Sequence, residues 1–161
     1  MELRNQTVIN SKDKPIPAPQ VMIYAAQEQN DTEYPTEVVL TALAEELTMP
    51  GTDMVQIGNT VFIGHRGEGK YKNVMEGRAL NVDTGRNFIN NGLKYIAYLQ
   101  RKGIKYYRSD FRSKQFLTAF QYWHQKSEDS DTEIAVVQLD TGGYRAFITI
   151  GEDSLKEFWS L

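Results

Sequence analysis

The segment from Ala79 to Lys126 limits the possible folds most, because its hydrophobic pattern changes several times without a break. A strand-like run leads into a glycine-bearing turn, a long helix, a short strand and a second helix. The turn, Asp83–Asn87, lies where the long helix begins. Free backbone N–H groups and the positive end of the helix dipole meet there, so we expect this turn to bind an anion such as a pyrophosphate.

Within this segment, apolar residues recur with the helical period from Phe88 to Leu99, and Gly103 is expected to end the helix. The next run, Ile104–Tyr107, has the composition of a short strand. A second helix with an aromatic buried face is expected to follow and to end before an acidic loop. Three polar residues are candidates for its cap: Ser109, Asp110 and Ser113.

The remaining pattern predicts strands and helices on both sides of this segment, with glycine, proline and asparagine marking the turns. The upstream predictions are a strand at Val21–Ala26, a helix from Thr36 to a stop at Pro50, a hairpin over Asp53–Ile63, a loop at Gly64–Lys72 and a strand at Val74–Val82. The downstream predictions are a hairpin formed by Ile134–Leu139 and Tyr144–Ile150, and a short terminal helix at Asp153–Trp159.

The first twenty residues hold three prolines between Pro15 and Pro19 and few side chains that could form a core. Proline fixes φ and removes a hydrogen-bond donor, so residues 1–20 are expected to form an extended arm. Residues 21–161 are long enough for one well-packed domain and too short for two. The sequence therefore predicts an arm followed by a single domain.

Composition weighs against several classes of protein. The net charge of −3 argues against a general nucleic-acid binder, and the absence of cysteine excludes disulfides and thiolate metal sites. The two histidines stand far apart in the chain, so no metal site is expected. No window approaches ~18 consecutive apolar residues. We expect no membrane partner and a cytoplasmic location, or a virion-associated one if a bacteriophage encodes the chain.

In order, the expected elements are a strand, a helix, two or three antiparallel strands, a long helix, a strand, a helix and a terminal hairpin. This order resembles that of the GCN5-related N-acetyltransferase family over roughly residues 21–150. The resemblance implies an acetyltransferase-like α+β fold of the three-layer type. Its central sheet would be mixed and mostly antiparallel, with helices on both faces and an opening where a central strand ends.

In that family a loop of pattern Q/R-x-x-G-x-G/A follows the central strand, and its backbone amides hold the pyrophosphate of acyl-CoA. Gly85 matches the first glycine here, whereas Val82 replaces the Gln or Arg and Asn87 replaces the final Gly or Ala. The resemblance nevertheless implies acetyl-CoA as the cofactor. The residues expected to bind it are Val82, Thr84, Gly85, Arg86, Asn87 and Phe88.

The family also carries an Asn-x-x-Ala-x-x-x-Tyr pattern on the next helix, whose tyrosine can protonate the departing thiolate. Tyr122 has the matching offset from Gln115, so the resemblance implies that Tyr122 is the catalytic acid. Glu76, on the strand before the loop, is the candidate base and would act through water. His65, expected in a loop, and His124 are alternative bases.

Two functions of different classes follow. The first is an acyl-CoA-dependent N-acyltransferase that acts on a small-molecule or protein amine. The second is a non-catalytic acetyltransferase-like protein that serves in interaction or virion assembly, with a protein partner or a second copy of the chain. The replaced loop residues and the proline-bearing arm favour the second function, and the glycine at the helix start favours the first.

Overall fold

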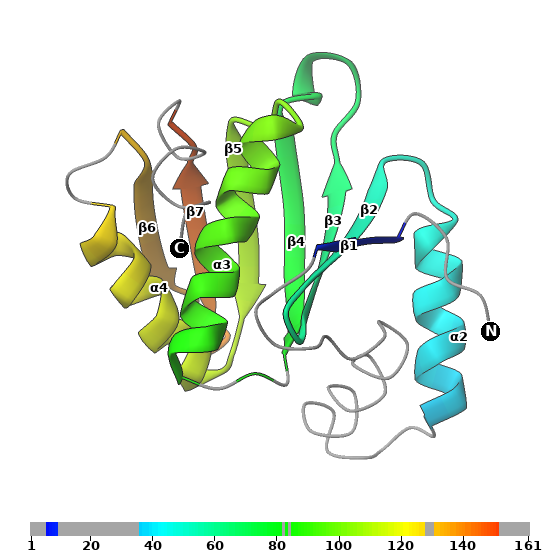
Figure 1. Cartoon of the computed structure of the whole chain (residues 1–161), viewed down its shortest axis with the longest axis horizontal. Coiled ribbons are helices and arrows are strands. Elements are labelled where there is room, and N and C mark those ends of the chain that lie inside the picture. The colour runs from blue at the N-terminus through cyan, green and yellow to red at the C-terminus, as the bar shows by residue number, and fades with distance from the viewer. Residues whose placement is uncertain (1–5, 10–35, 82, 84, 128–130, 152–161) are drawn as a thin grey trace.

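The computed structural model describes residues 6–9, 36–81, 83, 85–127 and 131–151. These residues form a seven-stranded sheet with the order β1-β2-β3-β4-β5-β7-β6 (Figure 1). The strands are β1 Gln6–Ile9, β2 Thr52–Ile57, β3 Thr60–Arg66, β4 Val74–Asn81, β5 Tyr106–Phe111, β6 Glu133–Gln138 and β7 Tyr144–Thr149. The helices are α2 Thr36–Leu47, α3 Gly85–Arg101 and α4 Lys114–Lys126, with a short 3₁₀ turn at Gly69–Tyr71.

The sheet is mixed and mostly antiparallel. Only the β1–β2 and β4–β5 pairs run parallel among the described strands. Helices α3 and α4 cover one face, where Phe62 of β3 stacks on Tyr95 of α3 with ring centroids 4.1 Å apart. His65 stands three residues after Phe62 on β3 and so points to the other face, because neighbouring strand residues point to opposite faces. Helix α2 covers that other face, where its Glu46 contacts His65. The expected fold class is confirmed.

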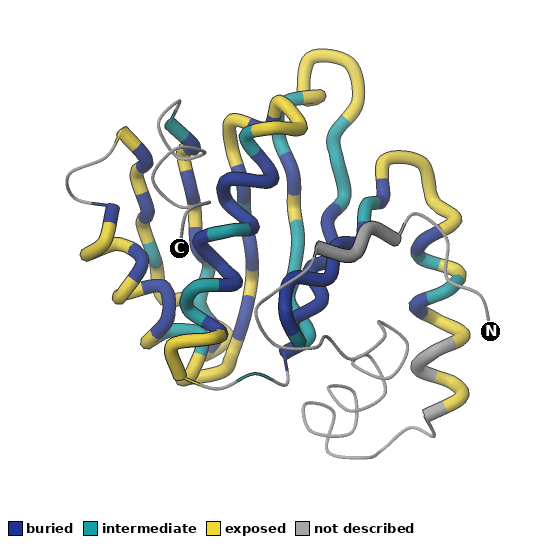
Figure 2. Tube along the Cα trace, viewed as in Figure 1, coloured by how far each residue is buried: buried dark blue, intermediate teal, exposed yellow. Residues whose placement is uncertain are grey.

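The main core lies between the sheet and the pair α3 and α4. Figure 2 shows α3 as buried over most of its length, whereas α2 and α4 each expose one side. The α3 residues Leu93, Ala97 and Leu99 are at most 1% exposed, which explains why this helix carries apolar residues on so much of its surface. A second, smaller apolar layer lies under α2, around Leu47 and Met54.

Strands β4 and β5 are paired over only three residues, from Val74 opposite Tyr106 to Glu76 opposite Arg108. Strand β4 continues to Asn81 and β5 to Phe111, but the described register holds no pair between them past this point. The two parallel strands therefore part toward their carboxyl ends. The remainder of β4 still pairs with β3 along its full length, so β4 presents an unpaired backbone edge to the gap.

Several boundaries differ from those expected. The predicted strand at Ile104–Tyr107 begins only at Tyr106 and runs on to Phe111, because Arg108 and Asp110 alternate with buried residues on a strand with one exposed face. Of the three candidate caps for α4, Ser113 is the one used: its hydroxyl accepts from the N–H of Phe116. Gly64–Arg66 belong to β3 and not to a loop, since β4 pairs with them.

Strand β1 lies inside the segment expected to be an arm, and it pairs in parallel with β2. No strand was expected there, because four residues followed by a proline-rich stretch carry little periodic signal. The strand expected at Val21–Ala26, the terminal helix expected at Asp153–Trp159 and most of the arm lie outside the described residues.

Candidate functional site

The head of α3 presents an accessible backbone. Gly85 has a φ of +55°, a left-handed conformation that glycine adopts at little cost. Among the described residues beyond its chain neighbours, none has an atom within 4 Å of the position where a Cβ would stand, so this side of the backbone is open to them. Gly85, Arg86 and Asn87 are all exposed, and the first-turn N–H groups of a helix have no partner within that helix. The geometry therefore suits an anion.

The residues expected to bind the cofactor do not all lie at the surface. Phe88 is only 2% exposed and belongs to the core, so its side chain is not available at the surface. Val82 and Thr84 lie outside the described residues. Of the six expected contacts, the structure brings Gly85, Arg86 and Asn87 together at the exposed start of α3.

A polar network supports this loop from the side of the sheet. The carboxylate of Asp83 accepts from the backbone N–H of Asn59 at 2.9 Å and from Nδ2 of Asn91 at 2.7 Å. Asn81 bonds both the N–H and the carbonyl of Asp83, at 3.0 and 2.5 Å, and accepts from Thr60 at 2.6 Å. The Asp83 carboxylate therefore points toward the β2–β3 turn and α3, which supply its hydrogen-bond donors Asn59 and Asn91.

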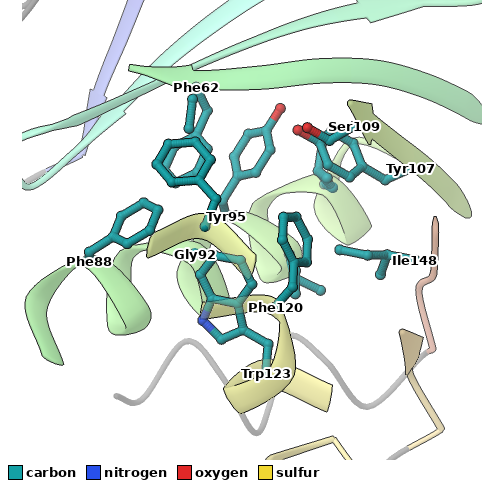
Figure 3. A pocket seen from close by; sticks show the side chains of 13 residues that line it. Phe62, Phe88, Gly92, Tyr95, Tyr107, Ser109, Phe120, Trp123 and Ile148 are labelled. Atoms are coloured by element: carbon teal, nitrogen blue, oxygen red, sulfur yellow. The ribbon is translucent and has the colours of Figure 1, made fainter. Parts of the chain in front are cut away.

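A small crevice lies where β4 and β5 part, beneath α3 and α4. Its volume is about 30 Å³, enough for roughly two water molecules. Its walls are almost entirely apolar and come from six elements far apart in the sequence (Figure 3). The lining residues are Phe62, Ala79, Phe88, Gly92, Tyr95, Ile96, Leu99, Tyr107, Ser109, Phe116, Phe120, Trp123 and Ile148.

Aromatic rings close the crevice between the two helices. Phe88 of α3 lies 5.0 Å from Phe116 and 5.7 Å from Trp123 of α4, measured between ring centroids. A Cβ at Gly92 would stand 2.2 Å from the Trp123 ring, so only glycine lets the indole pack this deeply. The indole N–H donates to the carbonyl of Ile89 at 2.8 Å, which fixes α4 against α3.

Two hydroxyl groups lie at the point where the strands part. Tyr107 and Ser109 of β5 both line the crevice, and Ser109 hydrogen-bonds the Tyr107 phenol (Figure 3). A Cβ at Gly77 of β4 would stand 2.8 Å from the Tyr107 hydroxyl, so this phenol reaches from β5 across to β4. Burial raises the pKa of Tyr107 well above its ordinary value, and the phenol stays protonated at neutral pH.

The expected acid does not line the crevice. Tyr122 is 37% exposed, and its ring lies 5.8 Å from the ammonium of Lys126. The side of α4 that lines the crevice carries Phe116, Phe120 and Trp123 on one helical stripe, and Tyr122 is one position away from it. If Ala119 is taken as the alanine of the family pattern, Trp123 stands at the tyrosine position.

The expected bases lie elsewhere. Glu76 ends the β4–β5 pairing on the face opposite the crevice, and its carboxylate forms an ion pair with Arg108. His65 lies on β3 of that same face, with Nε2 2.7 Å from Glu46 and Nδ1 3.0 Å from the hydroxyl of Thr52. His124 of α4 bonds the carbonyl of Ile134 through Nδ1 at 2.8 Å.

Arg78 completes the charged group on the α2 face. Its two terminal nitrogens donate to the two oxygens of Glu46 at 2.7 and 2.5 Å, a bidentate pair. The bond from Arg78 is the main reason that the pKa of Glu46 lies below its ordinary value, and His65 adds to the effect. Both His65 nitrogens have partners, so this network holds α2 against the sheet.

The described ranges contain no group of three or more His, Asp or Glu side chains that could hold a metal ion. They also contain no helix that is long and apolar enough to cross a bilayer.

The sequence carried no sign that Tyr107, Ser109 and Trp123 line the crevice or that Asn91 supports the loop at Asp83. A weak signal exists for Asn91, since a buried asparagine on an apolar helix face needs a partner. No local pattern marks Tyr107 or Ser109, because their position at the gap results from strand pairing.

Comparison with known proteins gives a likeness of fold. One similar solved structure is a "putative phosphinothricin N-acetyltransferase", 14% identical over 82% of this chain and 91% of the other, with a TM-score of 0.49. Another is yncA, a "putative acetyltransferase" from Salmonella typhimurium with its cofactor acetyl-CoA, 17% identical over 84% of this chain and 88% of the other, with a TM-score of 0.49. No protein-family model and no curated protein matches the chain.

Proposed function

We propose that the chain is an acyl-CoA-dependent N-acyltransferase that transfers an acyl group to an amine. One observation carries the proposal: β4 and β5 part after Glu76 and Arg108, beside a helix whose first amides are open to the surface. A gap between parallel strands in the middle of a sheet leaves backbone donors and acceptors unpaired, which is costly unless water or a ligand satisfies them.

The backbone around the gap fits acyl-CoA. The amides from Gly85 to Asn87 would hold the pyrophosphate, with Arg86 as an exposed cation beside it. The unpaired edge of β4 from Gly77 to Asn81 would hold the two amides of the pantetheine arm, much as it would hold a further strand. The crevice has a volume of about 30 Å³, which is too small for the pantetheine arm. Phe88 and Phe116 would have to move apart for the arm to enter.

Bound acyl-CoA would supply an activated acyl group as a thioester. The chain would then contribute binding, orientation and exclusion of water by the aromatic walls of the crevice. Glu76 is kept as the candidate base, because its carboxylate stands at the end of the β4–β5 pairing on the face opposite the crevice. An amine that approaches from that face would meet Glu76 where the strands part. Tyr122, outside the crevice, is not included in this proposal.

Acetyl-CoA binding to the full chain tests the proposal. The unfolding temperature should rise with ligand concentration as RT ln(1 + [L]/Kd) predicts, and titration calorimetry should give one site. Replacement Glu76→Gln should leave this affinity within about twofold and lower turnover of an amine panel about 100-fold or more. No stabilisation at millimolar acetyl-CoA would reject the proposal and leave the non-catalytic interaction protein as the remaining hypothesis.

A further inference from the structure

The crevice is lined by a pair of hydroxyls that the proposed function has not used, those of Tyr107 and Ser109. Both side chains come from β5, immediately before and after Arg108, whose pairing with Glu76 is the last one between the parted strands. They are 7% and 6% exposed, and both line the crevice. A carbonyl that reached the apex of the gap would lie beside these hydroxyls.

The Tyr107–Ser109 hydrogen bond uses one of the two hydroxyl protons. In the arrangement in which Ser109 donates and the phenol oxygen accepts, the Tyr107 O–H can donate to a second group. Its reach across to Gly77 places this donor over β4, at the start of the unpaired edge.

Tyr107 is better suited to donate a hydrogen bond than to transfer its proton. A buried phenol whose pKa is raised far above that of a thiol cannot protonate a departing thiolate efficiently. The same burial keeps the phenol neutral, and a neutral donor in an apolar site stabilises developing negative charge strongly. Arg78, on the opposite face of β4, is close enough to act on Tyr107 electrostatically and adds positive potential at this point.

We infer that the Tyr107 hydroxyl, held by Ser109, donates a hydrogen bond to the carbonyl oxygen of the acyl thioester. This inference rests on the proposed function. As the amine nitrogen bonds to the carbonyl carbon, the oxygen gains negative charge, and the C–S bond then breaks with its electron pair on sulfur. The proton of the amine passes to Glu76, and Tyr107 keeps its own proton throughout.

The test compares three variants, Tyr107→Phe, Ser109→Ala and the control Tyr98→Phe. Tyr98 is a buried tyrosine of α3 whose hydroxyl bonds Asp53 at 2.5 Å and which does not line the crevice. Calorimetry first measures the affinity of each protein for acetyl-CoA and for CoA, which lacks the carbonyl. Turnover is then measured with an amine that the wild-type protein accepts.

The wild-type protein should prefer acetyl-CoA over CoA by about 2- to 10-fold, the range for one net hydrogen bond. Tyr107→Phe should abolish this preference with unchanged CoA affinity, and should lower kcat about 100-fold with KM nearly unchanged. Ser109→Ala should reduce both effects about threefold to tenfold, and it serves as the test if Tyr107→Phe fails to fold. Tyr98→Phe should match the wild type in both ratios.

The outcomes separate the two claims. A wild-type protein that binds neither acetyl-CoA nor CoA rejects the proposed function, and this inference with it. A wild-type protein that binds and turns over acetyl-CoA, while the variants of Tyr107 and Ser109 keep the wild-type ligand preference and kcat, overturns the inference alone.

Discussion

Two exposed glycines of this chain share an unusual backbone conformation. Gly85 starts α3 with a φ of +55°, and Gly69 lies in the 3₁₀ turn between β3 and β4 with a φ of +58°. At both positions, no described residue beyond the chain neighbours comes within 4 Å of the place where a Cβ would stand. An alanine at either position would therefore be strained by its own backbone and by none of these residues.

The similar backbone conformations of Gly85 and Gly69 allow a controlled experiment. Gly85→Ala and Gly69→Ala should each lower the free energy of unfolding by about 1 kcal/mol, because alanine resists the left-handed conformation. Only Gly85→Ala should also weaken acetyl-CoA binding, since it changes the direction of the first amides of α3. Urea unfolding and calorimetric titration measure the two quantities. Equal affinities in both variants would remove the head of α3 from the cofactor site.

Among single residues, the sequence placed Gly85 at the start of a helix, as the structure has it, and gave no sign of the hydroxyls at the gap, for a physical reason. Gly85 follows from a local rule, since a glycine before a helical period marks a helix start. Tyr107 and Ser109 line the crevice only because β4 and β5 part above them, which no local pattern encodes. Tyr122 was chosen by an offset from Gln115, and one residue along a helix turns a side chain by about 100°.

Among the helices, α2 depends most on electrostatics for its place on the sheet. Glu46 accepts the bidentate bond from Arg78 of β4 and a bond from His65 of β3. The Glu46 side chain is 19% exposed, so solvent screens these bonds only in part. Because the folded pKa of Glu46 is below 4.5, the unfolded chain binds its proton more readily than the folded chain.

The contribution of Glu46 should therefore be complete above pH 4.5 and be lost as the pH falls through its lower folded pKa. Glu46→Gln should reduce stability at pH 7 by about 1 kcal/mol and remove this part of the pH dependence. Glu45→Gln, an exposed neighbour on the same helix, is the control. Stability curves from pH 3 to 7 that are parallel for Glu46→Gln and the wild type would contradict this role.

Periodicity predicted the long helix, α4, the β2–β3 hairpin and the β6–β7 hairpin, because each has a regular apolar pattern bounded by turn residues. It failed at β5, where Ser109 and Asp110 have the composition of a helix cap and yet continue a strand. It failed at Gly64–Arg66, where glycine suggested a loop. Gly64 is needed there because a Cβ would stand 2.3 Å from the sulfur of Met75.

The whole sheet consists of two paired halves joined at a narrow seam. Strands β3 and β4 pair over seven residues and β5 and β7 over six, whereas β4 and β5 pair over three. The helices α3 and α4 bridge the seam through Phe88, Phe116 and Trp123. Opening of the crevice would therefore require these rings to separate while each half of the sheet stays intact.

Phe116→Ala tests whether the closed aromatic rings oppose ligand binding. The variant should lose about 2 kcal/mol of stability, because it removes a partly buried ring, and it should bind acetyl-CoA more tightly, because the closed state is less favoured. Leu117→Ala is the control, since Leu117 also packs against the core but does not line the crevice. Thermal unfolding and calorimetry measure both effects. Affinities that fall together in the two variants would show that the aromatic closure does not oppose binding.

The close approach of Tyr107 to Gly77 ties two positions of different strands to one another. A Cβ at 77 would stand 2.8 Å from the phenol oxygen and 2.7 Å from the carbonyl oxygen of Ile63, so glycine is needed there both for the phenol and for the neighbouring strand. In related chains a tyrosine at 107 should therefore occur together with glycine at 77, whereas the glycine can persist where the ring is lost. Such a co-variation could be sought in any set of homologous sequences, without a ligand or an assay.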